Sequence, residues 1–424
     1  MNEVNRPLSP VERWYRIAEE FSALNVVARV RVHGQLDVPL LRKGLDAVQT
    51  RHPLLRATIT PGADPAFVAG APPIPLREAS GDWVRETDER ELAERLDLHR
   101  GPLARAVVVA VEPGVHDLLL TVSHCVADAI TVLSLAREWV ESAAGQVFGE
   151  LPALPAPEDL FPSRHRALRG TVGAAARVLS DQRKLRRADV RRLVPTAPVP
   201  DSARRTRLVH RELSPEQLEA LRNACRRHGS TVHGALAAAM VTAVARDAGV
   251  TGPCHYGIGS PIDFRGEVGV SGQDAGAYIA TVPSFVAYRP DGDFWDMATA
   301  VSRDLALRRS RGDHFSVITL LRWACPSGPA DSEAFRRVVA ARGPGNLCLS
   351  NIGVHDFPDR IGPWRLSGAQ FTTGLSISGY LAATVNTSHG ALFWNFSHID
   401  HAVPGDRARR IADLSVATAL EGLA

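Results

Sequence analysis

The chain of 424 residues has almost no lysine and few cysteines. Lys43 and Lys184 are the only lysines, so arginine carries nearly all the positive charge, and single arginines say little about function. The five cysteines are scattered, and none forms a Cys-x-x-Cys pair. This distribution argues against a disulfide framework or a zinc ribbon and suits a reducing compartment. We therefore expect a cytoplasmic protein with no metal site.

Long hydrophobic runs and targeting signals are also missing. No apolar run approaches the roughly 20 residues that cross a membrane, and residues 1–7 are polar and unlike a signal peptide. The formal net charge of +3 favours no class of partner, nucleic acid included. Neither a Gly-Lys-Ser/Thr phosphate loop nor a dinucleotide-binding glycine pattern occurs. We expect no membrane span and no bound cofactor.

Helical and strand-like patterns alternate along the chain in two halves of similar rhythm, which predicts an α/β protein. Residues 9–12 (Ser-Pro-Val-Glu) and 214–217 (Ser-Pro-Glu-Gln) each form a capping box that begins a helix. Between the halves, residues 164–207 carry 13 basic and 3 acidic side chains. We interpret this stretch as a solvated linker helix; a docking face for an acidic carrier protein or a phosphate group is the functional alternative. The expected domains are residues 1–165, 166–205 and 206–424.

One histidine lies where a buried strand is predicted to end. Residues 103–112 and 116–122 read as a hairpin, and the second strand leads directly to His124. A helical pattern follows Asp128, so this carboxylate lies near a helix N-terminus, where the helix dipole and free amides favour it. A neutral histidine can accept a proton from a hydroxyl or an amine. The pattern indicates a general base at His124 and a partner at Asp128 that shapes the loop.

Several stretches, in order, resemble one family. Residues 123–129 (Ser-His-Cys-Val-Ala-Asp-Ala) match the second histidine and the aspartate of an H-H-x-x-x-D-G motif. Further similar segments are the opening Leu8-Ser9-Pro10, residues 51–56 (Arg-His-Pro-Leu-Leu-Arg), residues 260–265 (Ser-Pro-Ile-Asp-Phe-Arg), residues 276–283 (Gly-Ala-Tyr-Ile-Ala-Thr-Val-Pro) and residues 349–353 (Leu-Ser-Asn-Ile-Gly). The set resembles the condensation-domain superfamily, which shares the chloramphenicol-acetyltransferase fold.

The resemblance implies a V of two lobes with a tunnel between them. The chain looks most like the free-standing, polyketide-associated acyltransferases of the phthiocerol dimycocerosyl transferase type. Such enzymes move an acyl group from a carrier protein or coenzyme A to a hydroxyl, and close neighbours form amides. The resemblance therefore implies direct transfer from a thioester to a natural-product or lipid acceptor, by a monomer.

The resemblance also assigns roles to residues. It implies that His124 is the general base and that Asp128 is held by Arg265, so we predict an ion pair between these two side chains. Ser123, Ala129, Ser350 and Asn351 are candidates to line the tunnel or to stabilise an oxyanion. Ser123 and Ala129 replace the motif's first histidine and its glycine. Alanine would be strained if that position needs unusual backbone angles, and would fit if it begins a helix.

Three rival hypotheses follow from the same residues. Cys125 beside His124 suggests covalent catalysis, but neighbours on a strand point to opposite faces. Residues 398–401 (His-Ile-Asp-His) suggest metal ligands but lack the spacing of a known zinc motif. The departures at Ser123 and Ala129 suggest a catalytically degraded domain that recruits or binds other proteins. An open tunnel beside His124 would favour the enzyme, and a plugged one would favour the binding module.

Overall fold

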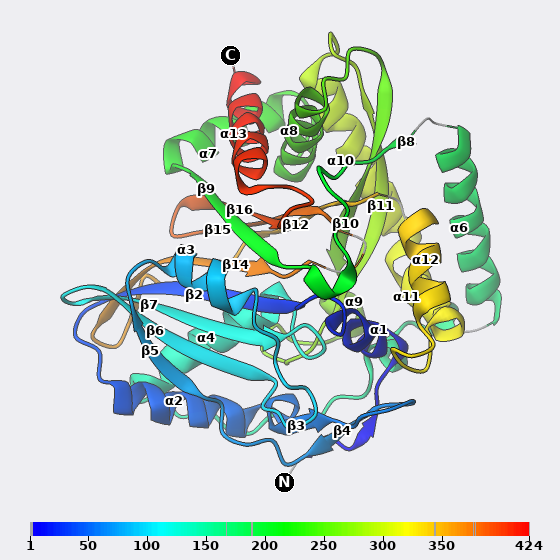
Figure 1. Cartoon of the computed structure of the whole chain (residues 1–424). Coiled ribbons are helices and arrows are strands. Elements are labelled where there is room, and N and C mark those ends of the chain that lie inside the picture. The colour runs from blue at the N-terminus through cyan, green and yellow to red at the C-terminus, as the bar shows by residue number, and fades with distance from the viewer. Residues whose placement is uncertain are drawn as a thin grey trace.

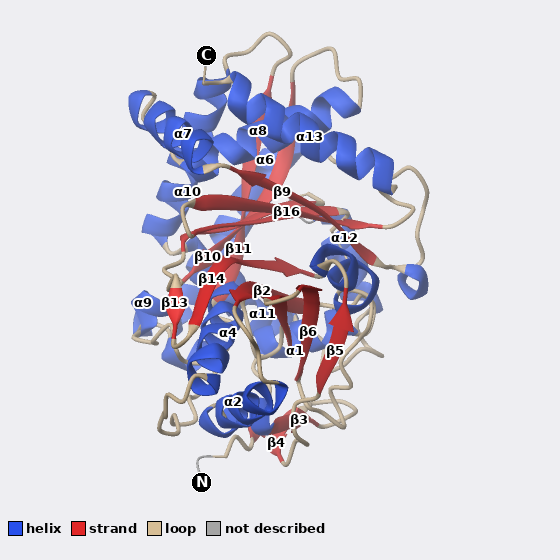
Figure 2. Ribbon diagram, turned by 90° about the vertical axis from the view of Figure 1, so that its left-hand side faces the viewer, coloured by secondary structure: helices blue, strands red, loops and turns tan. Residues whose placement is uncertain are grey.

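The computed structural model describes residues 3–423 except 167, 188, 189, 343, 344, 376 and 378. Two lobes lie one above the other in Figure 1, and each is a sheet with helices packed on it. In the view turned by 90°, the N-terminus again lies at the bottom of the molecule and the C-terminus at the top (Figure 2). The predicted α/β class and the two-lobed arrangement are confirmed.

The first lobe has a six-stranded sheet, with the helices α2 and α4 packed against each other beside it. In spatial order its strands are β13 (Arg360–Ile361), β14 (Trp364–Thr373), β2 (Asn25–His33), β7 (Val115–Ser123), β6 (Ala104–Glu112) and β5 (Leu76–Ser80). A small sheet holds β1 (Arg6–Pro7), β4 (Ala66–Ala69) and β3 (Ala57–Ile59). The helices are α1 (Pro10–Glu19), α2 (Val38–Arg51), α3 (Trp83–Glu86) and α4 (Ala129–Ala143).

The second lobe has a seven-stranded sheet, on which α8, α10 and α13 pack together. Along its main path the strands are β11 (Ile279–Tyr288), β10 (Cys254–Asp263), β12 (Leu347–Val354), β15 (Leu381–Ser388), β16 (Ala391–Ile399) and β9 (Thr206–Leu213), and β8 (Val190–Arg191) pairs with β10. The helices are α7 (Pro215–Arg227), α8 (Val232–Asp247), α9 (Arg265–Val268), α10 (Phe294–Arg311), α11 (Asp313–Ala324), α12 (Glu333–Arg342) and α13 (Gly405–Glu421).

The two capping boxes and the hairpin lie where the sequence predicts them. Both capping boxes are present, with Ser9 and Ser214 each accepting the amide of the residue three positions on. The predicted hairpin is β6 and β7, and Gly114 in its turn has a φ of 76° that favours glycine. In the charged stretch of residues 82–98, the helical segments end at Glu91.

The expected limits of the second lobe need one amendment. Residues 360–373 were assigned to it, but β14 pairs antiparallel with β2 in the first-lobe sheet. Phe371 and Leu366 are buried in the first-lobe core. The chain thus leaves the second lobe after β12, covers the free edge of β2, and returns as β15. Covering that edge satisfies backbone groups that would otherwise have no strand partner.

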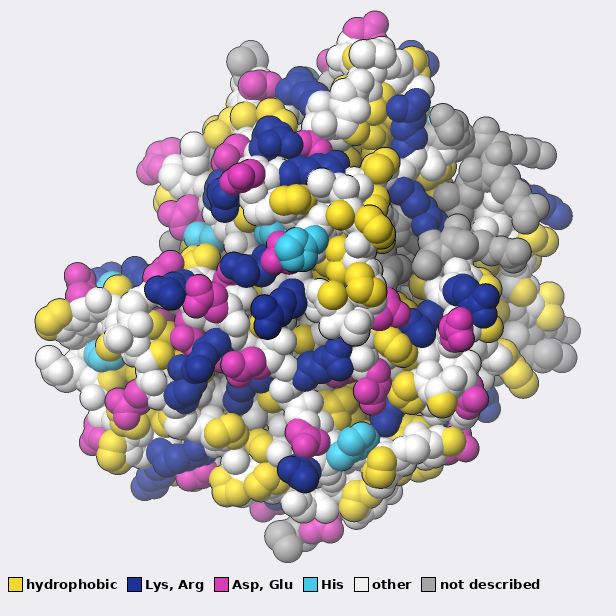
Figure 3. All heavy atoms as spheres, in the orientation of Figure 1, with side chains coloured by type: hydrophobic (Ala, Val, Ile, Leu, Met, Phe, Trp, Pro, Cys, Tyr) yellow, Lys and Arg dark blue, Asp and Glu magenta, His cyan; other side chains and the backbone are white. Residues whose placement is uncertain are grey.

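The basic stretch between the lobes includes α6 (Leu168–Arg187). Arg177 lies 3.3 Å from Asp313, and Asp181 lies 2.8 Å from Arg308, so this helix is tied to the second lobe by ion pairs. Residues 167, 188 and 189 of this stretch lie outside the described residues. On the face shown in Figure 3, basic and acidic side chains are interspersed. Among the described helices, none combines the length and the apolar character needed to span a bilayer.

An apolar cluster joins the two lobes. It brings α1 and the segment before α5 (Ser163–Arg166) against β11, α11 and the loop after β10. Its buried members are Val11, Phe161, Phe264, Tyr278, Ala280, Phe315 and Ile318. Because these side chains come from both halves of the chain, their burial fixes how the lobes meet and positions the site described next.

Candidate active site

His124 immediately follows β7 and begins the loop that leads into α4. Its backbone amide donates to the carbonyl oxygen of Leu24 at 3.2 Å, beside the start of β2. Strand pairing on one side and a helix start on the other hold this loop in place. The predicted location of His124, at the end of a buried strand, is confirmed.

A hydrogen bond fixes the protonation of the His124 ring. Nδ1 lies 2.7 Å from the carbonyl oxygen of Ala127. A carbonyl oxygen only accepts, so Nδ1 carries the proton and Nε2 of the neutral ring has a free lone pair. Burial lowers the pKa of His124 below the usual 6.5, although the Ala127 carbonyl and the Asp128 charge act in the opposite direction. The ring is therefore neutral at neutral pH.

Tyr15 of α1 supports the same ring from one face. The two ring centroids are 4.3 Å apart and the planes differ by 10°, which is a stacked arrangement. Burial raises the pKa of the Tyr15 hydroxyl, so the phenol is neutral at neutral pH. The stack and the Ala127 hydrogen bond together restrict rotation of the imidazole.

The predicted ion pair between Asp128 and Arg265 is present. Nη1 and Nη2 of Arg265 lie 2.6 and 2.8 Å from the two carboxylate oxygens, a bidentate geometry. Asp128 also caps α4 by accepting the amide of Thr131, and it accepts the amide of Tyr278. Burial alone would raise the pKa of Asp128, but the Arg265 charge and these hydrogen bonds outweigh it and lower the pKa.

The second lobe supplies more of this network. The Thr131 hydroxyl donates to the Gly276 carbonyl oxygen at 2.8 Å, and Ala127 forms an isolated bridge with Gly276. Gly276 has a φ of 151°, and a Cβ there would lie 2.5 Å from the Tyr278 ring, so only glycine fits. Arg265 lies over the Tyr278 ring, 4.9 Å from its centroid. The histidine loop is thus fastened directly to the opposite lobe.

A cavity of about 320 Å³ opens beside His124, and both lobes line it. Its volume is at the lower end of the range for small-molecule sites, about 300–1,000 Å³. The first-lobe sheet and α4 contribute Val26, His124, Asp128, Ala129, Ile130, Phe371 and Thr373, and the second lobe contributes His233, Pro261, Ile262, Asp263, Ile279, Leu305, Arg309, Ser350, Asn351 and Ile352.

The four candidate tunnel residues separate into two groups. Ala129, Ser350 and Asn351 line the cavity, as expected. Ser123 does not, because it is buried at the end of β7 and its hydroxyl oxygen accepts the amide of Cys125 at 3.3 Å. Ala129 is the first residue of α4 and has no positive φ, so alanine is unstrained at this position.

Cys125 and His398, which suggested covalent catalysis and metal binding, are not among the residues that line the cavity. The Cys125 thiol is buried, 3.8 Å from the carbonyl oxygen of Glu12, and is not part of the cavity lining. Burial raises its pKa, which disfavours the reactive thiolate. Nδ1 of His398 donates to the Val403 carbonyl oxygen at 2.6 Å. Within the described part of the chain, no group of three or more His, Cys, Asp or Glu side chains is arranged for a metal.

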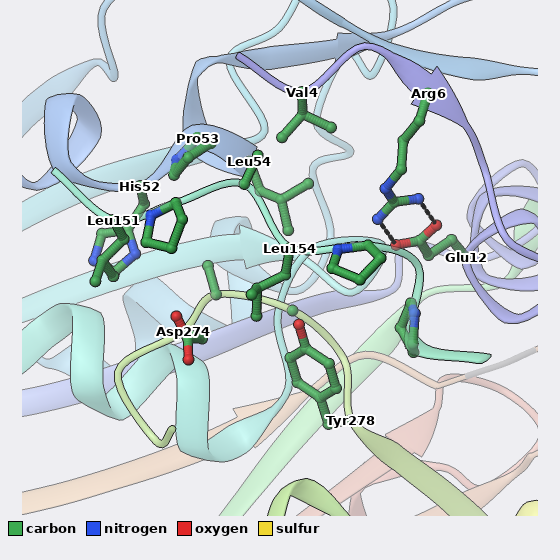
Figure 4. A pocket seen from close by; sticks show the side chains of 16 residues that line it. Val4, Arg6, Glu12, His52, Pro53, Leu54, Leu151, Leu154, Asp274 and Tyr278 are labelled. Carbon is green, nitrogen blue, oxygen red and sulfur yellow. Dashed lines mark hydrogen bonds and ion pairs between the residues drawn. The ribbon is translucent and has the colours of Figure 1, made fainter. Parts of the chain in front are cut away.

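A smaller hollow of about 20 Å³ is bordered by the Arg6–Glu12 ion pair, and the Tyr278 ring points toward it (Figure 4). Its volume suits about one water molecule. Tyr278 connects this hollow with the loop between His124 and Asp128, because its backbone amide donates to Asp128. A substrate-sized ligand fits the cavity beside His124 and not this hollow.

Two site residues had no sequence signal. Tyr15 lies in a helix with an ordinary amphipathic pattern, and its stack on His124 joins positions 109 residues apart. His233 lies near the start of a very apolar helix and belongs to no motif. Both contacts arise from the way the elements pack, which spacing along the chain does not encode.

Comparisons with known proteins agree with the fold. Residues 202–378 match a family described as phthiocerol/phthiodiolone dimycocerosyl transferase C-terminus. One of the linear gramicidin synthase proteins of Brevibacillus parabrevis is 30% identical over 141 residues, which cover 31% of this chain but 2% of that protein. The matched region is thus a small part of that relative.

Two solved structures have the same fold along nearly the whole chain. The first condensation domain of the calcium-dependent antibiotic synthetase has a TM-score of 0.72 at 16% identity, covering 99% of this chain and 96% of that one. Polyketide synthase associated protein 5 from Mycobacterium tuberculosis has a TM-score of 0.67 at 18% identity, covering 99% of both chains.

The buried ion pair generates a prediction about stability. Arg265→Met leaves the Asp128 carboxylate buried without its counter-charge, and we expect the free energy of unfolding to fall by about 3–5 kcal/mol. The same substitution at Arg211, whose pair with Asp413 is largely exposed, should cost less than about 1 kcal/mol. Denaturant unfolding of both variants measures the difference. Adding Asp128→Asn to Arg265→Met should recover part of the loss, because asparagine still caps the helix without a charge. Equal losses at Arg265 and Arg211 would contradict the assignment.

Proposed function

We propose that the chain is an acyltransferase of the condensation-like kind that uses His124 as its general base, because residues 202–378 match a transferase family and the whole chain has the fold of a condensation domain. It moves an acyl group from a thioester to a hydroxyl or an amine. The observation that carries this proposal is the His124 ring, neutral and protonated on Nδ1, beside a cavity lined by both lobes.

The chemistry follows from the lone pair on Nε2. Nε2 removes a proton from the acceptor hydroxyl or amine as that group attacks the thioester carbonyl carbon. The tetrahedral intermediate collapses, the carbon–sulfur bond breaks, and the thiolate takes the proton from the imidazolium ring. No covalent acyl-enzyme is needed, in keeping with the buried Cys125 thiol.

The oxyanion of the intermediate needs hydrogen-bond donors. The amides of Ala129 and Ile130 belong to the first turn of α4, where amides have no partner within the helix, and both residues line the cavity. Asn351 also lines the cavity, and its Oδ1 accepts the amide of Gly353, which orients the side chain. We assign oxyanion stabilisation to these groups.

The donor is an acyl carrier protein or a coenzyme A thioester, and the acceptor is a small natural-product or lipid molecule. The enzyme acts as a cytoplasmic monomer and needs no cofactor. The donor, the acceptor and the monomer are inferred from the resemblance, the small size of the acceptor from the cavity volume, and the location from the cysteine distribution.

The ion pairs of Arg177 with Asp313 and of Asp181 with Arg308 favour the linker interpretation of α6 over a docking face at positions 177 and 181.

The alternative of a degraded binding module depended on Ser123 and Ala129. Ser123 is buried and hydrogen bonded, and Ala129 simply begins α4, so neither departure disturbs His124, Asp128 or Arg265. The cavity beside His124 likewise supports the enzyme.

Acyl transfer should depend on His124. We expect the protein to form an ester or amide from a panel of acyl-coenzyme A and acyl-carrier thioesters with alcohols and amines, detected by mass spectrometry. His124→Ala should lower kcat/KM by about 10²–10⁴-fold, the range for losing a general base. His99→Ala is the matched control, because Nδ1 of His99 also hydrogen bonds to a carbonyl oxygen but lies outside the cavity. A His124→Ala variant with near-full activity would overturn the proposal.

The pH dependence of kcat/KM should follow the pKa of His124. Burial lowers this pKa below 6.5, so the base stays neutral above that pH and becomes protonated only at lower pH. The value of kcat/KM should therefore be flat near neutral pH and fall as pH decreases, by about tenfold per unit below the midpoint. Initial rates across pH with a non-titrating acceptor alcohol measure the profile. A midpoint above 6.5 would argue against this histidine as the base.

A further inference from the structure

A second histidine faces the cavity from the opposite lobe. His233 lines the cavity together with the apolar side chains of Ile262, Ile279 and Leu305. The mechanism proposed above makes no use of it. An imidazole among apolar neighbours is a group that can orient a ligand by hydrogen bonding.

The His233 ring is held in place before any ligand binds. Its Nε2 lies 3.0 Å from the hydroxyl of Ser260, which is fully buried on β10. The helix that carries it begins with Thr231 as cap. At Gly234 this helix packs so closely on α10 that a Cβ would lie 2.3 Å from the carbonyl oxygen of Ala298. The backbone beneath His233 is therefore fixed.

The other ring nitrogen is available. Among the described residues, Nδ1 of His233 has no hydrogen-bond partner, and it is not sealed within the protein. Burial lowers the pKa of His233 to about 4, so the ring is neutral at working pH and too weak a base to compete with His124. The Ser260 hydroxyl can donate or accept, so either tautomer is possible and Nδ1 can accept or donate toward the cavity.

We propose that His233 is a substrate-recognition residue whose Nδ1 hydrogen bonds to a hydroxyl or carbonyl oxygen of the substrate. The inference rests on the proposed function and adds a substrate class, because it selects a molecule with an oxygen substituent away from the reacting atoms. The oxygen belongs to the acyl donor or to the acceptor. A site built to bind such an oxygen discriminates against the analogue that lacks it, because its polar group is then left unpaired.

Binding of two matched pairs of unreactive probes tests this proposal. The donor pair is the ketone analogues of octanoyl- and 3-hydroxyoctanoyl-pantetheine, in which a methylene replaces the thioester sulfur. The acceptor pair, used without a donor, is 2-phenylethanol and 1-phenyl-1,2-ethanediol. Isothermal titration should show that the wild-type protein binds the oxygenated member of one pair about tenfold more tightly. The pair that shows the preference identifies the substrate that His233 contacts.

Two variants assign the preference to the ring nitrogen. His233→Phe should bind both members of that pair with the affinity that the wild type has for the less oxygenated one. His233→Asn, which places an amide near the position of Nδ1, should keep part of the preference. Equal affinities within both pairs in the wild type, or a preference that His233→Phe retains, would overturn the proposal.

Two further measurements distinguish a failure of the His233 proposal from a variant that does not fold and from a failure of the proposed acyl transfer. If His233→Phe does not fold, the ¹⁵N resonance of Nδ1 in the wild-type protein replaces it, and the oxygenated probe should shift that resonance while the other does not. An unshifted resonance would overturn the proposal. Turnover of octanoyl-pantetheine thioester by the wild type is measured separately. Its absence, together with inactivity on the wider thioester panel, would count against acyl transfer, whereas the binding preference tests His233 alone.

Discussion

The arrangement of the site depends on the ion pair between Asp128 and Arg265. The two residues are 137 positions apart and belong to different lobes, and both are almost fully buried. Arg265 also contacts Asp263, Thr131 and the Gly276 carbonyl oxygen. A bidentate pair in surroundings of low dielectric is stable only when most of its hydrogen-bonding groups are satisfied. The pair therefore holds the two lobes in a fixed position relative to each other.

The Asp128–Arg265 ion pair also affects the hydrogen bonding and the pKa of His124. The carboxylate of Asp128 binds Arg265 and two backbone amides, and the partner of His124 Nδ1 is instead the carbonyl oxygen of Ala127 in the same loop. Asp128 thus acts through the loop and makes a positioning contribution. Its negative charge raises the His124 pKa, but burial has the larger effect and leaves the ring neutral. The apolar cluster around Phe264 and Phe315 supports the same lobe contact.

The sequence was informative where a short stretch determines structure. The capping boxes at Ser9 and Ser214, the hairpin before His124 and the helix start at Asp128 depend on a few neighbouring residues. The pairing of Asp128 with Arg265 came from the family resemblance, because nothing in the spacing connects two positions so far apart.

Features that depend on tertiary packing were not predictable. β14 crosses to the first lobe because the edge of β2 is free there, and its own sequence carries no sign of that partner. The Tyr15 stack and the orientation of His233 arise from how helices lie on distant strands. Ser123 replaces the first histidine of the motif and was a candidate to line the tunnel, but it is buried and its hydroxyl oxygen accepts the amide of Cys125.

The central claim is that the fold holds His124 as a neutral base with its lone pair on Nε2. Long-range ¹H–¹⁵N correlation spectra of the protein labelled at histidine nitrogens measure this directly, with His124→Ala used to assign the signals. At neutral pH we predict a protonated Nδ1 and an unprotonated Nε2, with titration only below pH 6.5. A proton on Nε2, or a charged ring at neutral pH, would contradict the account.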